Sequence, residues 1–211
     1  NSSGWNAVTA TSSNATAIGV TAAAGAPATS FTMQVSQLAT AQSTASTAVP
    51  TGSAIGSGSL TIALGQWAGT SFTAGGGAAV SLTIDASDTL SAIASKINDA
   101  GAGVSATVLR DASGERLLLR SNETGEANGF RITANDSSLS GLAFDAGNPA
   151  GQVLSQSGQN ALATVNNVPI SSASNRLADT LPGMTIQLQQ ITTQPVEINV
   201  STDVEAIRKN V

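Results

Sequence analysis

Hydrophobic and polar residues alternate in many short stretches of this chain, which is the pattern of a strand with one face in a core and the other in solvent. In the stretch 31–35, for example, Phe, Met and Val alternate with Thr and Gln. Stretches with this pattern are found at residues 31–35, 60–64, 80–84, 104–108, 117–119, 130–132, 165–170, 184–188 and 196–200. The pattern predicts a predominantly β chain built from short strands.

One segment has the helical period instead. Its apolar residues fall at i, i+3, i+4, i+7 and i+10, which places them on one face of a helix. They are Leu90, Ile93, Ala94, Ile97 and Ala100. Ser87 or Asp88 is expected to cap the first turn, and Gly101 is suited to end the helix in the left-handed conformation. We predict one amphipathic helix at about 88–100, with its apolar face buried against the following hairpin.

Other segments have the composition of turns and linkers. Residues 111–115, Asp-Ala-Ser-Gly-Glu, are expected to form a loop of about five residues between two strands of a hairpin. Trp67 is placed in a Gly-rich loop that continues into a turn over 69–77. Residues 43–58 are interpreted as a linker or domain crossing, and residues 134–160 as loop.

Composition removes most catalytic chemistry. The chain has no His and no Cys, so it lacks the usual transition-metal ligands, a Cys nucleophile, a Ser-His-Asp triad and disulfides. Three acidic residues, Glu115, Glu123 and Glu126, lie near one another in sequence, as in a glycosidase pair, but are interpreted as solvated loop charges. We therefore predict no enzyme, no catalytic residue, no metal site and no cofactor.

The charges favour protein contacts over other partners. With 13 acidic and 8 basic residues, the net charge is −5, which argues against nucleic acid as a partner. No apolar run is long enough to span a membrane. Cations gather between Lys96 and Arg131, so a patch of Arg110, Arg116 and Arg120 is a candidate interface. The alternative is that these arginines form the solvated face of a hairpin.

Two tryptophans are present, and aromatic residues are enriched at interface hot spots. Trp67 is the better interface candidate, whereas Trp5 is as readily explained as a structural anchor. The chain begins at Asn1 without Met and ends within a helical pattern, so we expect it to be a piece of a longer protein.

Several segments together resemble the bacterial flagellar hook-associated protein 2 family, the filament caps, and they follow one another in the family's order. The helix and hairpin at 89–132 and the pattern N-x-L-x-D-x-x-P-G-M-T-I at 175–186 are the most specific of them. The segments are FTMQVSQLATAQ (31–42), GSGSLTIALG (56–65), TLSAIASKINDAGAGVSATVLRDASGERLLLRSNETGEANGFRI (89–132) and ATVNNVPISSASNRLADTLPGMTIQLQ (163–189).

The resemblance implies an α+β, predominantly β fold of two head domains, one inserted in the other. Residues 1–44 and 159–202 would form the discontinuous outer domain, and 45–158 the inserted one. Residues 203–211 would begin a helix, capped by Thr202 or Asp203, that leads to a leg domain outside this chain. The long terminal helices of the family, which would form a coiled coil, are also outside it.

The same resemblance implies a structural role. The full-length protein would form a homo-oligomeric ring at the extracellular tip of the flagellum and promote the folding and insertion of flagellin, next to hook-filament junction proteins. The alternative function is an adhesin head that binds host mucin or glycans. Both hypotheses place the work on the protein surface.

Overall fold

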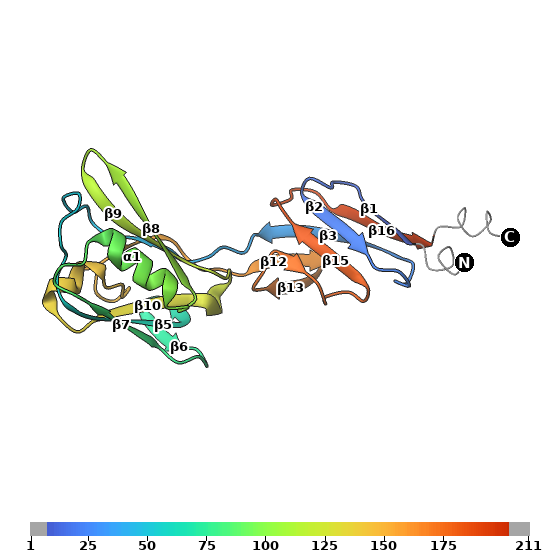
Figure 1. Cartoon of the computed structure of the whole chain (residues 1–211). Helices are drawn as coiled ribbons and strands as arrows, with labels where there is room; N and C mark the ends of the chain where they lie inside the picture. Colours follow the sequence, from blue (N-terminus) through green and yellow to red (C-terminus); the bar gives the residue numbers. More distant parts are fainter. Residues whose placement is uncertain (1–7, 203–211) are drawn as a thin grey trace. The chain divides into compact units, whose positions relative to one another are not determined.

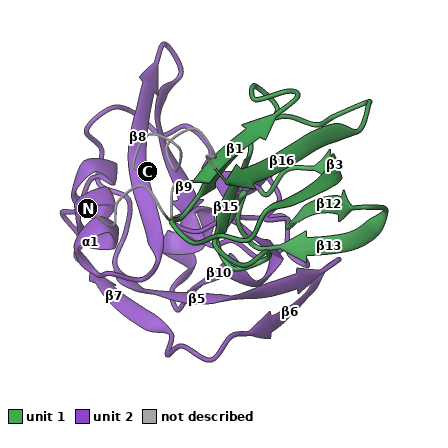
Figure 2. Cartoon of the chain, turned by 90° about the vertical axis from the view of Figure 1, so that its right-hand side faces the viewer, with its two compact units in different colours: residues 1–39, 160–211 green, residues 40–159 purple. Residues whose placement is uncertain are grey.

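The computed structural model describes residues 8–202, which are predominantly β with one α-helix (Figure 1). The chain divides into two compact units (Figure 2). Unit 1 combines residues 1–39 with 160–211, and unit 2 comprises residues 40–159. Trp5 and the helix expected at 203–211 lie outside the described residues.

Unit 1 is formed by two antiparallel sheets. The larger has the order β1-β16-β3-β12-β13 and the smaller the order β14-β15-β2. Their strands are β1 (Val8–Ser12), β2 (Ile18–Ala22), β3 (Thr29–Gln37), β12 (Ala161–Val165), β13 (Val168–Ser172), β14 (Arg176–Leu177), β15 (Met184–Leu188) and β16 (Val196–Thr202). Strands from the two ends of the sequence pair with each other in both sheets, so unit 1 needs both segments of the chain.

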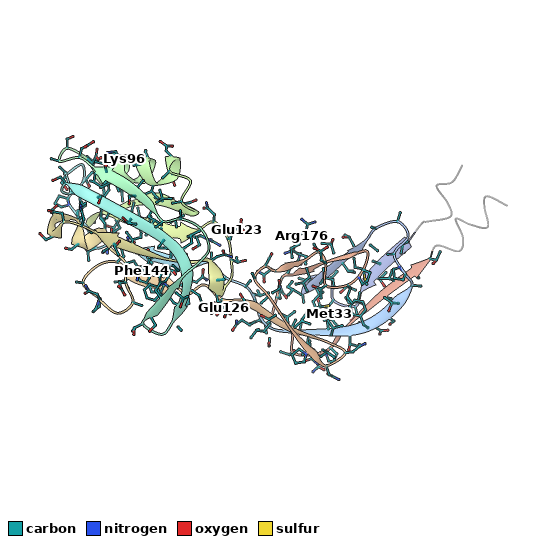
Figure 3. The ribbon with its side chains drawn as sticks, turned by 90° about the horizontal axis from the view of Figure 1, so that it is seen from below. Met33, Lys96, Glu123, Glu126, Phe144 and Arg176 are labelled. Carbon is teal, nitrogen blue, oxygen red and sulfur yellow. The ribbon has the colours of Figure 1, made fainter. Side chains whose placement is uncertain are left out.

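The core of unit 1 follows the alternation seen in the sequence. In β3, Phe31, Met33 and Val35 are buried while their neighbours are not (Met33 is labelled in Figure 3). Ile186 of β15 and Ile198 of β16 are both fully buried in the same cluster. Side chains from both sheets thus fill one core, as expected for two packed sheets.

The amide side chain of Asn175 binds the backbone of Ala39, close to the boundary of unit 1. The Nδ2 group of Asn175 donates to the carbonyl of Ala39 at 3.0 Å, and its Oδ1 accepts from the N–H of Ala39 at 2.7 Å. One side chain therefore satisfies both backbone groups of a residue, as a neighbouring strand would.

Unit 2 contains two sheets and the helix. One sheet runs β10-β5-β6, with β7 also paired to β5, and the other runs β11-β4-β9-β8. The elements are β4 (Ser43–Ala45), β5 (Gly58–Ala68), β6 (Ser71–Ala74), β7 (Val80–Ile84), α1 (Leu90–Asp99), β8 (Val104–Asp111), β9 (Gly114–Ser121), η2 (Glu126–Asn128), β10 (Gly129–Ala134), η3 (Ser137–Leu142) and β11 (Val153–Gln156). Both sheets and the helix contribute to a single core.

Gly65 lets β5 change partners. Beyond its pairing with β7, β5 pairs with β6 from Gly65 onward, while β10 lies on its other edge. A Cβ atom at Gly65 would lie 2.2 Å from the carbonyl oxygen of Thr73 and 2.7 Å from the ring of Phe72. Only glycine allows this approach of the two strands.

The helix α1 agrees with the predicted face and differs at its cap. Ile93 and Ile97 are 0% and 1% exposed, and Gly101 has a φ of 62°, so the buried face and the left-handed end are confirmed. The cap, however, is Thr89, whose side chain accepts from the N–H of Ala92. The prediction of Ser87 or Asp88 was wrong, because the Asp88 carboxylate has other partners.

Asp88 instead joins the helix to the strand before it. Its Oδ2 accepts from Lys96 Nζ at 2.5 Å and from the N–H of Asp85 at 2.8 Å. Lys96 also donates to the Asp85 carboxylate at 3.1 Å. The Lys96 hydrogen bond, followed by the Asp85 N–H, lowers the pKa of Asp88, and the bonds to Asp88 and Asp85 raise the pKa of Lys96.

A second amide anchors the other end of α1. Asn98 Nδ2 donates to the carbonyl of Ala106 in β8 at 2.9 Å, and Asn98 Oδ1 accepts from the N–H of Ala106 at 2.8 Å. Ala106 is itself buried. Asn98 therefore binds β8 in the way that Asn175 binds Ala39.

Two segments read as linker or loop are partly ordered structure. Within 43–58, β4 pairs with β9 and β11, and Val49 bridges to Glu115. Within 134–160, η3 and β11 form, and Leu139 and Leu142 are buried in the core. The interpretation was wrong because these strands are rich in Ser, Thr and other small or polar residues, so their sequences show no alternation of hydrophobic and polar positions. They are strands because they pair with segments far away in the sequence.

Candidate interaction surfaces

The hairpin β8–β9 holds the three arginines of the predicted patch and separates them. It closes through Ala112 and Ser113 instead of the predicted five-residue loop. Arg110 lies opposite Glu115, and its Nε donates to Glu115 Oε1 at 2.8 Å. The Glu115 side chain is 2% exposed, so the interpretation of Glu115 as a solvated loop charge was wrong.

Arg116 and Arg120 lie on the other face of the hairpin. In β9 they alternate with residues buried in the core, so Arg116, Leu118 and Arg120 point away from it. Arg116 Nη1 donates to the carbonyl of Ser46 at 3.3 Å, and Arg120 is exposed. Within residues 8–202, neither guanidinium group forms an ion pair. The structure thus groups two of the three arginines.

Neighbouring strands extend this surface. Leu118 lies opposite Thr107 of β8 and Ala45 of β4, and Ala45 lies opposite Val153 of β11, which is 64% exposed. A shallow groove of about 360 Å³ runs beside Leu118 and Arg120. We call this surface, made by Ala45, Arg116, Leu118, Arg120 and Val153, the outer face of the sheet.

The outer face combines an apolar centre with positive charge at its flanks. The alternation of Arg116, Leu118 and Arg120 was visible in the sequence and indicates a common face. The contribution of Val153 was not, because β11 reaches this sheet from far along the chain. Such a surface suits a protein partner that offers apolar contacts and carboxylates.

Trp67 lies near the end of β5 and not in a loop, which corrects the predicted environment. It is half-buried, and its Nε1 donates to the carbonyl of Phe130 at 2.9 Å. Its ring lies 4.9 Å from that of Phe72 and 5.7 Å from that of Phe144, and Arg131 lies 4.8 Å over the Phe72 ring. Much of Trp67 therefore belongs to the core of unit 2, and an interface role for its remaining surface stays a prediction.

The acidic residues of the described part of the chain do not gather into a metal-binding cluster. No cluster of three or more metal-ligating His, Cys, Asp or Glu side chains occurs in residues 8–202. Glu123 and Glu126 are exposed (Figure 3), whereas Glu115 is buried. Among the same residues, no helix is long and apolar enough to cross a membrane. The outer face therefore remains the main candidate surface.

Family sequence patterns match three parts of the chain. The pattern for the N-terminus of flagellar hook-associated protein 2 matches residues 1–42, and that for its C-terminus matches residues 158–211. The flagellin hook IN motif matches residues 69–123.

Curated relatives match over most of the chain. It is 34% identical over 224 residues to the B-type flagellar hook-associated protein 2 of Pseudomonas aeruginosa, covering 96% of this chain and 45% of the relative. It is 36% identical over 180 residues to the flagellar hook-associated protein 2 of Escherichia coli K12, covering 81% of this chain and 36% of the relative. The chain thus spans less than half the length of these relatives.

Solved structures match the fold. The crystal structure of the flagellar cap protein FliD D2-D3 domains from Escherichia coli has a TM-score of 0.83 and 33% identity, covering 93% of this chain and 100% of that one. The D1-D2-D3 structure from the same species has a TM-score of 0.85 and 32% identity, covering 99% of this chain and 58% of that one.

Proposed function

The chain belongs to the flagellar hook-associated protein 2 family, and from this premise we propose that it is the head region of a flagellar filament cap. In this proposal the whole protein forms a homo-oligomeric ring at the extracellular tip of the filament, where it promotes the folding and insertion of flagellin. The observation that carries it is the 33% identity over 93% of the chain to the flagellar cap D2-D3 structure. The family is a structural one, and its role needs no catalytic residue.

The proposed mechanism is geometric. A ring whose symmetry differs from that of the filament leaves a gap into which the next flagellin subunit inserts. The head must then offer contacts that form and break, and small polar surfaces with few large apolar groups suit such transient contacts. The outer face fits this role, because Leu118 and Val153 provide modest apolar area and Arg116 and Arg120 provide steering charge.

Filament growth in a motile bacterium that lacks its own cap protein tests the proposal. We would restore growth with a full-length cap protein carrying these 211 residues as its head, and measure filament length by electron microscopy. The charge reversals Arg116→Glu and Arg120→Glu are expected to shorten the filaments, whereas the control Arg176→Glu, on β14 of unit 1, should not. Filaments of normal length in the cap deletion itself would refute the assembly role.

The head alone is expected to associate weakly. Stable interfaces bury at least about 1,200 Å² with a dry apolar centre. The exposed large apolar residues of unit 1 are Leu162 on β12, Val168 on β13 and Ile191 between β15 and β16. Sedimentation at micromolar concentration should give a monomer, and a tight, salt-insensitive ring would show that the heads drive assembly.

The adhesin alternative gains no support from the relatives, whose names describe hook-associated and cap proteins. Hook-filament junction proteins as partners likewise rest on the family resemblance alone. A glycan array with the isolated chain tests the adhesin directly, and absence of binding would remove it.

A further inference from the structure

Unit 2 contains a second surface feature, apart from the outer face. A hollow of about 220 Å³ lies between the end of β5, the start of β10 and the end of β11, and we call it the Trp67 hollow. Trp67, Phe144 and Leu154 form its apolar walls, and Glu126 contributes a carboxylate. The four side chains come from four separate parts of the sequence, so the hollow exists only in the folded unit.

The lining of the hollow defines the chemistry of a ligand. Of the residues that form it, only Glu126 is charged, and none is a cation. The amide of Gln42, which also lines it, is already used, because Nε2 donates to the carbonyl of Phe130 and Oε1 accepts from the N–H of Phe130. An apolar stem with a positive end therefore fits best, since the stem would contact Leu154 and the cation would meet Glu126 and the Trp67 ring.

The size of the hollow indicates one side chain and not a whole small molecule. Clefts that hold drug-sized ligands measure about 300–1,000 Å³, which exceeds the volume here. A lysine side chain has the required apolar stem and positive end. The question is then how the rest of a partner would be held.

Strand β11 could hold the rest of such a partner by pairing with it. It is an edge strand that, among the described residues, has β4 as its one strand neighbour. All four of its residues are exposed, and it carries neither a charge nor a proline that would oppose pairing. It is short and has a register shift between Leu154 and Gln156, so an added strand would pair over only a few residues. Leu154 belongs both to this edge and to the wall of the Trp67 hollow.

We propose that an extended segment of a partner protein adds as a strand to β11 and places a lysine side chain in the Trp67 hollow. Main-chain hydrogen bonds to β11 provide binding, and the hollow selects the side chain, as in other cases of strand addition. This inference goes beyond the cap function, because it depends only on unit 2 and on the chemistry of the hollow.

The test uses the whole chain with Trp5→Phe, so that Trp67 is the single tryptophan. The probe is the acetylated, amidated pentapeptide Val-Thr-Lys-Thr-Val, and its match has norleucine in place of lysine. Binding is followed by the NMR shifts of the Trp67 indole N–H and of the backbone amides of 153–156. Both groups of signals are expected to shift on adding the lysine peptide.

Two variants separate the carboxylate from general charge. Glu126→Gln should weaken the lysine peptide about threefold, as for the loss of one exposed ion pair, and leave the norleucine peptide unaffected. Glu123→Gln, which removes an exposed carboxylate outside the lining of the hollow, is the matched control and should change neither.

Three results would overturn the proposal. One is equal binding of the lysine and norleucine peptides, and another is an equal effect of the two Glu→Gln changes. The third is a shift of the Trp67 indole signal without any shift in 153–156, which would indicate a small-cation site and not strand addition.

Discussion

Changing Asn98 to Asp should destabilise unit 2 by an amount that its two hydrogen bonds define. The substitution keeps the oxygen that accepts from the N–H of Ala106 at 2.8 Å, but it places a second oxygen where Nδ2 now donates to the Ala106 carbonyl at 2.9 Å. Removing that donor leaves the Ala106 carbonyl unsatisfied, which costs about 1–3 kcal/mol. The free energy of unfolding should therefore fall by about 1–3 kcal/mol.

Urea denaturation followed by Trp67 fluorescence, with Trp5 replaced by Phe, measures this change in unit 2 itself. The matched control is Asn122→Asp, because the exposed Asn122 uses its oxygen to accept from the Ser105 hydroxyl and keeps that acceptor after substitution. The control should lie within about 0.5 kcal/mol of the parent protein. If Asn98→Asp is as mild as this control, the paired amide contact does not anchor α1 to β8.

Three further predictions address the core, the acid stability and the units. Ile93→Ala or Ile97→Ala should lower the free energy of unfolding by about 2–5 kcal/mol in the same assay. A loss below about 0.5 kcal/mol at both positions would contradict the burial of this helix face. Because Lys96 holds the pKa of Asp88 below its ordinary value of 3.8, the stabilisation by Asp88 is present above that value and is lost as the pH falls through its folded pKa. Asp88→Asn should therefore flatten the acid end of a stability-against-pH curve, and an unchanged curve would contradict the argument. Replacing residues 40–159 by a short Gly/Ser linker should leave unit 1 folded by circular dichroism, whereas failure of both separated units to fold would indicate one continuous domain.

Strong periodicity made parts of the fold predictable from sequence. Strand β7 and the buried face of α1 follow directly from the spacing of Leu, Ile and Val, because their burial depends on neighbours close in the chain. Strands β4 and β11 were missed, since Ser, Thr and Gln make them resemble linkers and only pairing with distant strands orders them. The cap was misplaced for a similar reason, because the Asp88 carboxylate accepts from Lys96, eight residues further along the chain.

The candidate surfaces were less predictable than the fold. Arg116 and Arg120 could be assigned to one face from alternation, but Arg110 could not be separated from them without knowing that Glu115 is buried opposite it. The Trp67 hollow is lined by residues that are far apart in the sequence, so no local sequence pattern predicts it. Both examples depend on strand register, which single-sequence periodicity leaves open.

The nesting of unit 2 within unit 1 has a consequence for the order in which the chain can fold. The β8–β9 hairpin of unit 2 joins strands that are close in sequence, and β4 then pairs with β9 and β11 at longer range. Unit 1 must pair Gln37 with Leu162 across the whole insertion. Once unit 2 has formed, the N–H of Thr40 lies 3.0 Å from the carbonyl oxygen of Gln159, so the ends of that long loop are already together. Shortening the effective loop from the length of unit 2 to a few residues lowers the entropic cost of pairing β3 with β12 by about 3 kcal/mol. We therefore expect unit 2 to act as a folding nucleus for unit 1, and changes that slow the folding of unit 2 should delay both units.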